Sequence, residues 1–389
     1  MSTRRTLGVL ILLSIFGGVL FLHSLFFGEY GLRDPFLFER PASYLRTEFS
    51  ACFKTKEFRN NAWRSDCLRT LGDRALASFG VDETLVGLSE IQNDSNIKPY
   101  CHAFGHVIGQ REFEKTNSLG EAFLTCRKTI ACGEGCFHGA VESYLRTFGG
   151  NLSKESVDGA CNPDDAKNEV TRLACVHGIG HAAMLEYNGD VYASLPVCDY
   201  LTKASDKDEC YAGVFMEDTF TYGSPNGNSL ITPSKPTYPC EEIEERYKRQ
   251  CYASRSTFVL QSSNSDYEKT SHFCERLPQQ YRNVCYGAFG GQAVLQSEDP
   301  VYAVAICEAA KRKEDRTQCF MEVMKFKGHS LAGAPEGFRG VCEAVSEENI
   351  LSCYALAGKE AERWHPNERE AQCKMIAPDT THFMACVRD

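Results

Sequence analysis

Apolar residues follow two different patterns along this 389-residue chain. A continuous apolar run extends from Leu7 to Phe27, interrupted only by small residues, two serines and one histidine. Beyond it, apolar and small residues recur three or four positions apart, as in YRNVCYGAFGGQAVL at residues 281–295. Spacing of this kind predicts helices with one apolar face. The continuous run instead predicts a helix that spans a membrane.

The apolar run is long enough to cross a bilayer, because at about 1.5 Å per residue it extends roughly 31 Å. A cleaved signal peptide is the alternative, but it would have a shorter run and a small-residue cleavage site, which FLHSLFFGEYG does not offer. Arg4 and Arg5 precede the run and favour a cytoplasmic N-terminus. We therefore expect a cytoplasmic tip, a transmembrane signal anchor, a tether and an extracytoplasmic domain, at residues 1–6, 7–27, 28–48 and 49–389.

Twenty cysteines lie between Cys52 and Cys386, all outside the apolar run. An even number of cysteines in a chain that crosses into an oxidising compartment is typical of a disulfide framework. Thiolate zinc sites are the competing interpretation, but no CxxC spacing occurs. The spacing predicts these pairs: Cys52–Cys67, Cys126–Cys136, Cys161–Cys175, Cys198–Cys210, Cys240–Cys251, Cys274–Cys285, Cys307–Cys319, Cys342–Cys353 and Cys373–Cys386. Cys101 and Cys132 remain, and we expect them to cross-link neighbouring repeats, with an intermolecular bridge as the alternative.

The second cysteines of these pairs recur about every 34 residues, a period typical of helix-turn-helix solenoids. Polar, turn-like segments between paired cysteines indicate that the first cysteine ends one helix and the second begins the next. The predicted fold is all-α, with disulfide-stapled helical-hairpin repeats that form an α/α solenoid or curved array behind the N-terminal transmembrane helix. We divide it into histidine-bearing repeats, a proline-rich inserted loop and structural repeats, at residues 49–217, 218–239 and 240–389.

Three pairs of polar residues occupy one position of this repeat. Residues four apart lie on the same face of a helix, about one turn from each other. The pairs are His102 with His106, His138 with Glu142, and His177 with His181. In the later repeats the same two positions are mostly small, as at Ala253 and Gly287, and carry no comparable pair.

Five histidines and a glutamate at a packed position need partners, because buried polar groups are costly unless they are hydrogen-bonded. A metal ion satisfies all six together, and neutral imidazole with carboxylate suits a divalent transition metal, of which zinc and iron fit best. The six residues named above are therefore the predicted metal ligands. A metal-free pocket for an anion or polar ligand, and histidines that only hydrogen-bond backbone carbonyls, are the two alternatives.

Helix spacing limits how these pairs can share an ion. Adjacent helices pack about 8–10 Å apart, so three helices in a flat row would separate the outer pairs by roughly 16–20 Å. Either the array curves tightly here, or two ions lie in the two grooves, with His138 and Glu142 between them. The sequence leaves both arrangements open.

The chain carries 42 basic and 52 acidic residues and no basic block, which disfavours nucleic acid as a partner. We expect a membrane-attached, extracytoplasmic metal-binding protein, and more specifically a metalloenzyme with a mono- or dinuclear site. Glu142 would bridge ions or act as general base on a metal-bound water, in a hydrolase or an oxidoreductase. The alternative is a non-catalytic repeat module that binds a protein, peptide or glycan. The sequence names neither the substrate nor the partner protein.

Overall fold

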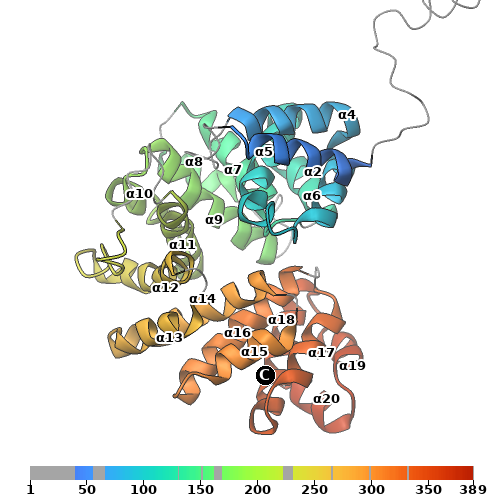
Figure 1. Ribbon diagram of the computed structural model, residues 1–389, viewed down its shortest axis with the longest axis vertical. Helices are drawn as coiled ribbons and strands as arrows, with labels where there is room; N and C mark the ends of the chain where they lie inside the picture. The colour runs from blue at the N-terminus through green and yellow to red at the C-terminus, as the bar shows by residue number, and fades with distance from the viewer. Residues whose placement is uncertain are drawn as a thin grey trace, which may run out of the picture. The chain divides into compact units, whose positions relative to one another are not determined.

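The computed structural model describes residues 40–55, 66–129, 131–149, 152–161, 169–221, 231–263, 266–297, 299–330 and 333–388. The expected cytoplasmic tip and transmembrane helix, residues 1–27, lie outside these ranges. Among the helices that are described, none is both long and apolar enough to cross a membrane. Residues 41–389 form one compact unit (Figure 1).

The described part of this unit is all-helical, as the sequence predicts, with one isolated bridge between Thr232 and Lys235 and no strand. Its helices are α2 (Pro41–Cys52), α4 (Asp66–Ile91), α5 (Lys98–Thr116), α6 (Leu119–Lys128), α7 (Gly135–Arg146), α8 (Lys154–Ala160), α9 (Glu169–Glu186), α10 (Val191–Cys198), α11 (Ala204–Phe220), α12 (Glu245–Ser262), α13 (Tyr267–Arg276), α14 (Gln279–Gln296), α15 (Pro300–Glu308), α16 (Lys313–Ser330), α17 (Pro335–Ala344), the 3₁₀ turn η2 (Glu347–Asn349), α18 (Ile350–Trp364), α19 (Arg369–Ile376) and α20 (Thr380–Val387).

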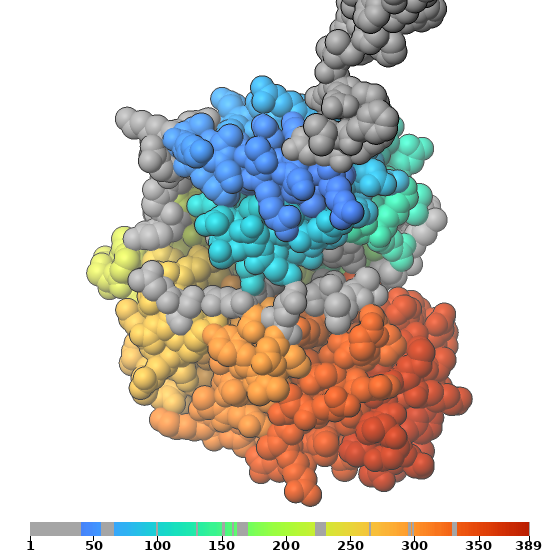
Figure 2. Space-filling view, turned by 45° about the vertical axis from the view of Figure 1, so that its right-hand side comes forward, coloured from blue at the N-terminus to red at the C-terminus, as the bar shows by residue number. Residues whose placement is uncertain are grey.

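The helices pair into hairpins along the chain, each a short first helix followed by a second one. The hairpins are α6–α7, α8–α9, α10–α11, α13–α14, α15–α16, α17–α18 and α19–α20, and each pair is in contact. In the repeat that contains α12, turns around Cys240 take the place of the first helix. In the lower part of Figure 2 the colour passes from yellow through orange to red, because successive hairpins of the C-terminal half lie beside one another.

Acidic and hydroxyl side chains begin several of the first helices. Asp190 accepts hydrogen bonds from two backbone N–H groups at the start of α10, and Asp266 and Asp299 each accept one at the start of α13 and α15. Ser153 forms a reciprocal capping box with Ser156 at the start of α8. Such caps satisfy N–H groups that have no partner within the helix, so they fix where each hairpin starts.

Ten disulfides staple the repeats, and all ten predicted pairs are confirmed, Cys101–Cys132 included. No cysteine is free. This number of bridges indicates an extracytoplasmic or secreted environment. The second cysteine begins its helix, as expected, at Cys67 and Cys136, which each lie one residue after the start of α4 and α7, but Cys285 lies six residues after the start of α14. The first cysteine lies near the end of its own helix, as Cys274 does in α13, so each bridge joins the two helices of one hairpin close to their connection.

The second helices of the hairpins line up side by side. Contacts run from α5 to α7, α9, α11, α12, α14, α16, α18 and α20 in turn. The row curves so far that α18 also contacts α9. The row as a whole is therefore curved rather than flat.

Helix α2 occupies the last part of the range expected as a tether. It begins at Pro41, and Ala42, Leu45 and Phe49 lie at helical spacing and are buried. The face they form packs on α4. Helix α2, which ends at Cys52 and is bridged to Cys67 of α4, is therefore part of the packed unit. The sequence predicts the inserted loop at residues 218–239, but α11 extends to Phe220. Residues 222–230 of that loop lie outside the described ranges.

Candidate metal centre

Three neighbouring helices supply the histidines that the sequence singles out. His102 and His106 lie on α5, His138 on α7, and His177 and His181 on α9. Helix α7 packs between α5 and α9. The histidines of each helix face the same space, because the spacing of four returns to the same helical face.

Glycines allow the backbones of these helices to touch. A Cβ atom on Gly109 of α5 would lie 1.8 Å from the carbonyl oxygen of Cys136, and one on Gly139 of α7 would lie 1.9 Å from that of His106. Between α9 and α11, a Cβ on Gly213 would lie 2.1 Å from the carbonyl oxygen of His177. Real Cβ atoms do not approach other atoms this closely, so only glycine permits the separation. Helices that touch in this way lie closer than the roughly 8–10 Å assumed for ordinary packing. The distance between the outer histidine pairs, which had argued against one shared ion, is shorter accordingly.

Replacing Gly139 with alanine should open the α5–α7 contact. The new methyl group would collide with backbone, so the helices must separate, at a cost of about 1–3 kcal/mol in unfolding free energy. Metal affinity should fall with it, because His106 and His138 lie on the two helices that separate. Urea unfolding and metal titration measure both effects. Gly340→Ala is the matched control, because its Cβ would meet only Pro300, at 3.7 Å; equal effects in both variants would contradict the argument.

Four of the imidazoles form one compact cluster. The side chains of His102, His106, His138 and His181 each offer a ligand atom, and these atoms all lie within 4.8 Å of one another. His106, His138 and His181 are buried, whereas His102 is partly exposed. Within the described ranges, no other group of three or more histidine, cysteine or acidic side chains is placed to hold an ion. This buried cluster could hold a metal ion.

The spacing of the four rings matches tetrahedral coordination. A metal–nitrogen distance of about 2.0–2.1 Å puts each ring centroid about 3.2 Å from the ion, so that centroids at tetrahedral corners lie about 5.2 Å apart. The six observed separations lie between 4.8 and 6.1 Å. The chain thus holds the rings at the spacing that one ion needs.

Three of the four rings are oriented through their Nδ1 atoms. His106 donates from Nδ1 to Oε1 of Glu142 at 2.7 Å, and His181 donates to Oε2 of Glu217 at 2.9 Å. His102 donates to the backbone carbonyl of Cys132 at 2.8 Å. Partners of this kind fix the tautomer with Nε2 unprotonated and raise its basicity, as around metal-binding histidines. In the same cluster, Nε2 of His138 and Nε2 of His181 are buried without a hydrogen-bond partner.

Burial and mutual repulsion set the charge of the cluster. Burial, together with the neighbouring imidazoles, holds the pKa of His102 and of His138 well below 6.5. Burial also lowers the pKa of His181, against the opposing effect of Glu217. Burial would lower the pKa of His106 as well, but the Glu142 carboxylate outweighs it and raises that pKa. Three of the four imidazoles are therefore neutral at neutral pH, as metal ligands must be.

Glu142 lies behind the cluster, where it orients other side chains. It accepts hydrogen bonds from His106 and, through Oε2, from Nε2 of Gln110 at 2.7 Å. Burial would raise the pKa of this carboxyl, but the charge and hydrogen bond of His106 prevail and lower it to about 2. The structure therefore brings Glu142 to the site as an ionised carboxylate in contact with a ligand ring.

His177 lies beside the cluster of four. Its ring stacks on that of His138, with centroids 4.9 Å apart. Its Nδ1 donates to Glu209 at 2.8 Å, and its Nε2 lies 3.3 Å from Sδ of Met216. The structure thus brings all six predicted residues together in one region, with four imidazoles converging, Glu142 behind them and His177 at the edge.

Sequence reasoning missed Glu217, Glu209 and Gln110. Glu217 follows His181 by 36 residues, as Glu142 follows His106. A search for carboxylates one repeat after each histidine would therefore have found it. The predicted ligand pairs rest on the residues four positions after His177 and after its equivalents in the other repeats. In the next repeat that residue is Met216, which precedes Glu217.

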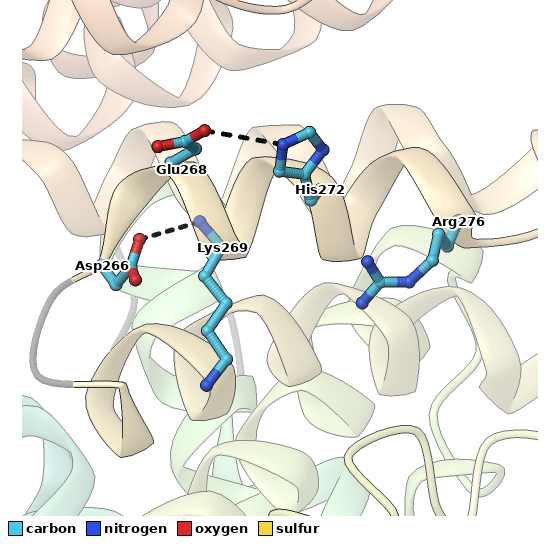
Figure 3. Close-up of a pocket in the computed structure, with 5 residues that line it drawn as sticks. All are labelled: Asp266, Glu268, Lys269, His272 and Arg276. Carbon is cyan, nitrogen blue, oxygen red and sulfur yellow. Dashed lines mark hydrogen bonds and ion pairs between the residues drawn. The ribbon is translucent and has the colours of Figure 1, made fainter.

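A second group of titratable side chains lies on the surface of α13 (Figure 3). Asp266, Glu268, Lys269, His272 and Arg276 line a shallow depression there. Glu268 and His272 form an ion pair 3.8 Å long, and both side chains are more than half exposed. All five residues are exposed, so the depression has none of the buried convergence seen among the four histidines.

Comparison with known proteins gave no match to a family model, to a curated protein or to a solved structure. The site itself is therefore the basis for a functional conclusion.

Proposed function

We propose that this chain is an extracytoplasmic metal-binding protein, and that one ion lies among His102, His106, His138 and His181. The observation that carries the proposal is the buried, unpartnered Nε2 of His138 and of His181 inside a cluster with tetrahedral spacing. Buried polar atoms without hydrogen bonds are costly, and coordination removes that cost at both atoms.

Charge favours a divalent cation over an anionic ligand. The carboxylates of Glu142 and Glu217 contact two of the rings, and Glu142 is ionised because its pKa is about 2. Once His106 gives up its proton to make way for an ion, two carboxylates behind four imidazoles balance the charge of one divalent ion. The same two negative charges would repel an anion, which argues against the metal-free anion pocket.

The donor set supports a first-row transition metal, and a single one. Four imidazole nitrogens in tetrahedral array suit zinc, while iron and copper also accept imidazole. A dinuclear site requires bridging oxygen ligands between ions about 3.5–4 Å apart. Glu142, the expected bridge, is engaged by His106 and Gln110, so we assign it an orienting role and propose one ion.

A catalytic role would depend on His138. The other three rings are each oriented by Glu142, Glu217 or the Cys132 carbonyl, whereas Nδ1 of His138 lies only against Nε2 of His102, at 3.3 Å. Catalytic zinc sites keep three protein ligands and one water. If His138 yields its place to water, the remaining three histidines form such a site, and metal-assisted hydrolysis becomes the function.

The placement of this centre completes the proposal. Ten disulfides suggest an oxidising compartment, and the apolar run at residues 7–27 would attach the chain to a membrane with its N-terminus in the cytoplasm. The metal would then be bound on the far side of that membrane, in the periplasm, in a lumen or at the cell surface.

Elemental analysis of the purified full-length chain tests the proposal. We expect about one transition-metal ion per chain, removable by a chelator and restored by zinc. A folded chain that takes up no zinc, iron, copper or manganese would exclude the metal site. It would favour the non-catalytic repeat module, with a protein, peptide or glycan as its partner.

Replacing Glu142 with glutamine should weaken zinc binding by about 10–100-fold, the usual effect of losing an outer partner of a ligand histidine. The amide keeps the shape of the side chain but removes the negative charge beside His106. Competition with a chromophoric chelator measures the change. Glu112→Gln is the matched control: Glu112, on α5, is likewise a buried glutamate, but its partners are Thr125 and Lys115 rather than a histidine. Equal losses in the two variants would refute the orienting role.

A further inference from the structure

The edge of the four-histidine cluster carries a second pair of ligand atoms. Nε2 of His177 and Sδ of Met216 lie 3.3 Å apart, on α9 and α11. Nδ1 of His177 donates to Glu209, because a carboxylate only accepts. Nε2 of His177 therefore faces the sulfur of Met216, and both are atoms that can donate a lone pair to a metal ion. A cation between the two atoms would accept from both.

The position of this pair is suited to an incoming ion. His177 and Met216 are partly exposed, and so is the Glu209 side chain, at 25 %. His106, His138 and His181 are buried behind them. The stacking of His177 on His138 makes the edge continuous with the cluster. An ion that approaches from solvent can thus contact His177 and Met216 next to the four-histidine site.

Ligand softness and charge indicate which ion fits. Thioether sulfur is a soft donor that selects copper(I), and imidazole also binds copper. Glu322 and Glu209 raise the pKa of Lys325 on α16, so the ammonium group of Lys325 interacts electrostatically with Glu209, the partner of His177. Lys325 and a divalent ion in the four-histidine cluster would both repel a further cation. A monovalent ion would be repelled less than a divalent one.

We propose that His177 and Met216 form a copper(I)-selective subsite beside the four-histidine site, with Glu209 fixing the tautomer of His177. The proposal builds on the proposed function, because it assigns a copper ion as a second metal of the same centre. It requires no redox step: the copper is bound as copper(I) and remains so.

Anaerobic copper(I) titration of the zinc-loaded, full-length chain, followed by X-ray absorption at the copper edge, tests this subsite. We expect one equivalent of copper(I) with nitrogen and sulfur among its ligands. Every cysteine is bridged, so the sulfur must be a methionine. Loss of an outer partner already costs about 10–100-fold in metal affinity, so Met216→Leu should weaken copper(I) binding by at least about 100-fold and remove the sulfur signal.

Two controls separate this proposal from the four-histidine site. Met321→Leu, at an exposed methionine on α16, should leave copper(I) binding and the sulfur signal unchanged. Met216→Leu should leave the zinc content at one per chain. Copper(I) bound by nitrogen alone, or bound equally well by Met216→Leu, would overturn the subsite. A chain that takes no zinc but keeps sulfur-bound copper(I) would refute the four-histidine site alone.

Discussion

A chain with both His106→Ala and His181→Ala is expected to bind zinc at least about 1,000-fold more weakly than the wild type. Loss of an outer partner costs about 10–100-fold in affinity, and here two direct ligands are lost together. The stabilisation of the fold by zinc should be lost together with the affinity. At a free zinc concentration 1,000 times its dissociation constant, the wild type gains about 4 kcal/mol in unfolding free energy, and the double variant should gain almost none.

Competition with a chromophoric chelator measures the affinity, and urea unfolding with and without zinc measures the stabilisation. His272→Ala is the control, because this exposed histidine on α13 is not part of the cluster. Circular dichroism must first show that the double variant is folded, because the two substitutions also take the histidine partners away from the buried carboxylates of Glu142 and Glu217. Zinc binding of unchanged strength in the folded double variant would rule out the four-histidine site.

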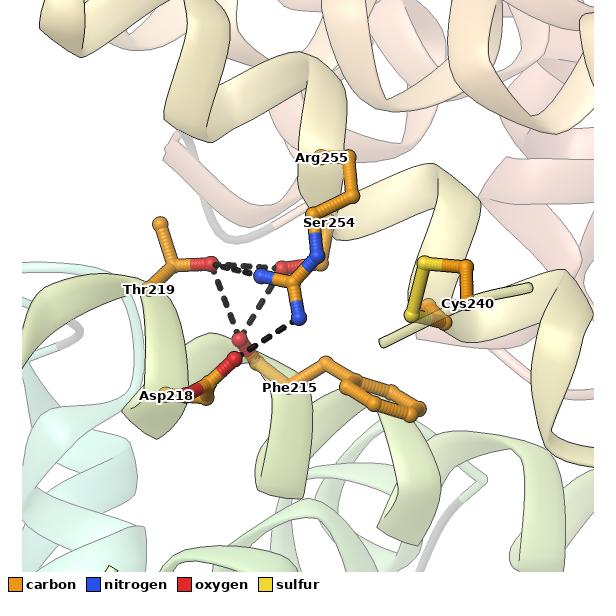
Figure 4. Close-up of a disulfide and its surroundings, with 7 residues drawn as sticks. Phe215, Asp218, Thr219, Cys240, Ser254 and Arg255 are labelled. Carbon is orange, nitrogen blue, oxygen red and sulfur yellow. Dashed lines mark hydrogen bonds and ion pairs between the residues drawn. A yellow bond between two sulfur atoms is a disulfide. The ribbon is translucent and has the colours of Figure 1, made fainter. Parts of the chain in front are cut away.

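Arg255→Met should lower the unfolding free energy by about 3–5 kcal/mol, because it leaves Asp218 charged, buried and without its cation. Both side chains are fully buried, and Nη2 of Arg255 donates to Oδ2 of Asp218 at 2.7 Å (Figure 4). Nη1 reaches the hydroxyl of Thr219 at 3.4 Å. The pair joins α12 to α11, next to Glu217, so the loss should also weaken metal binding through His181.

Two further variants locate the cause of that loss. Replacing both partners, with Arg255→Met and Asp218→Leu, should recover most of the stability, because a buried ion pair replaced by apolar groups is often neutral or better. Arg246→Met is the control, since Arg246 is 52 % exposed and its bond to Glu244 lies at the surface; such pairs contribute about 0–1 kcal/mol. Similar losses at Arg255 and Arg246 would show that burial is not the cause.

The repeat and its bridges could be predicted because cysteine spacing records local geometry. Each of the nine regular pairs, such as Cys274–Cys285, closes a short loop across one hairpin, and the Cα atoms then lie 5.4 to 5.8 Å apart. The histidine pairs could be predicted for the same reason, since a spacing of four specifies one helical face. Both signals depend only on residues close together in the chain.

The convergence of the histidines could not be predicted from those spacings. It depends on how closely α5, α7 and α9 approach, which Gly109 and Gly139 determine through contacts with the neighbouring helix. In the sequence these glycines look like ordinary small packing residues. The roles of Glu142 and Glu217 depend on the same approach, because each carboxylate reaches a histidine on the preceding helix of the row.

Anomalous diffraction from crystals of the zinc-loaded chain, recorded at the zinc edge, tests the central claim most directly. The account predicts one strong peak about 2.0–2.1 Å from a nitrogen atom of each of His102, His106, His138 and His181. A single zinc peak elsewhere in the molecule, with these four rings ordered and no density between them, would contradict it.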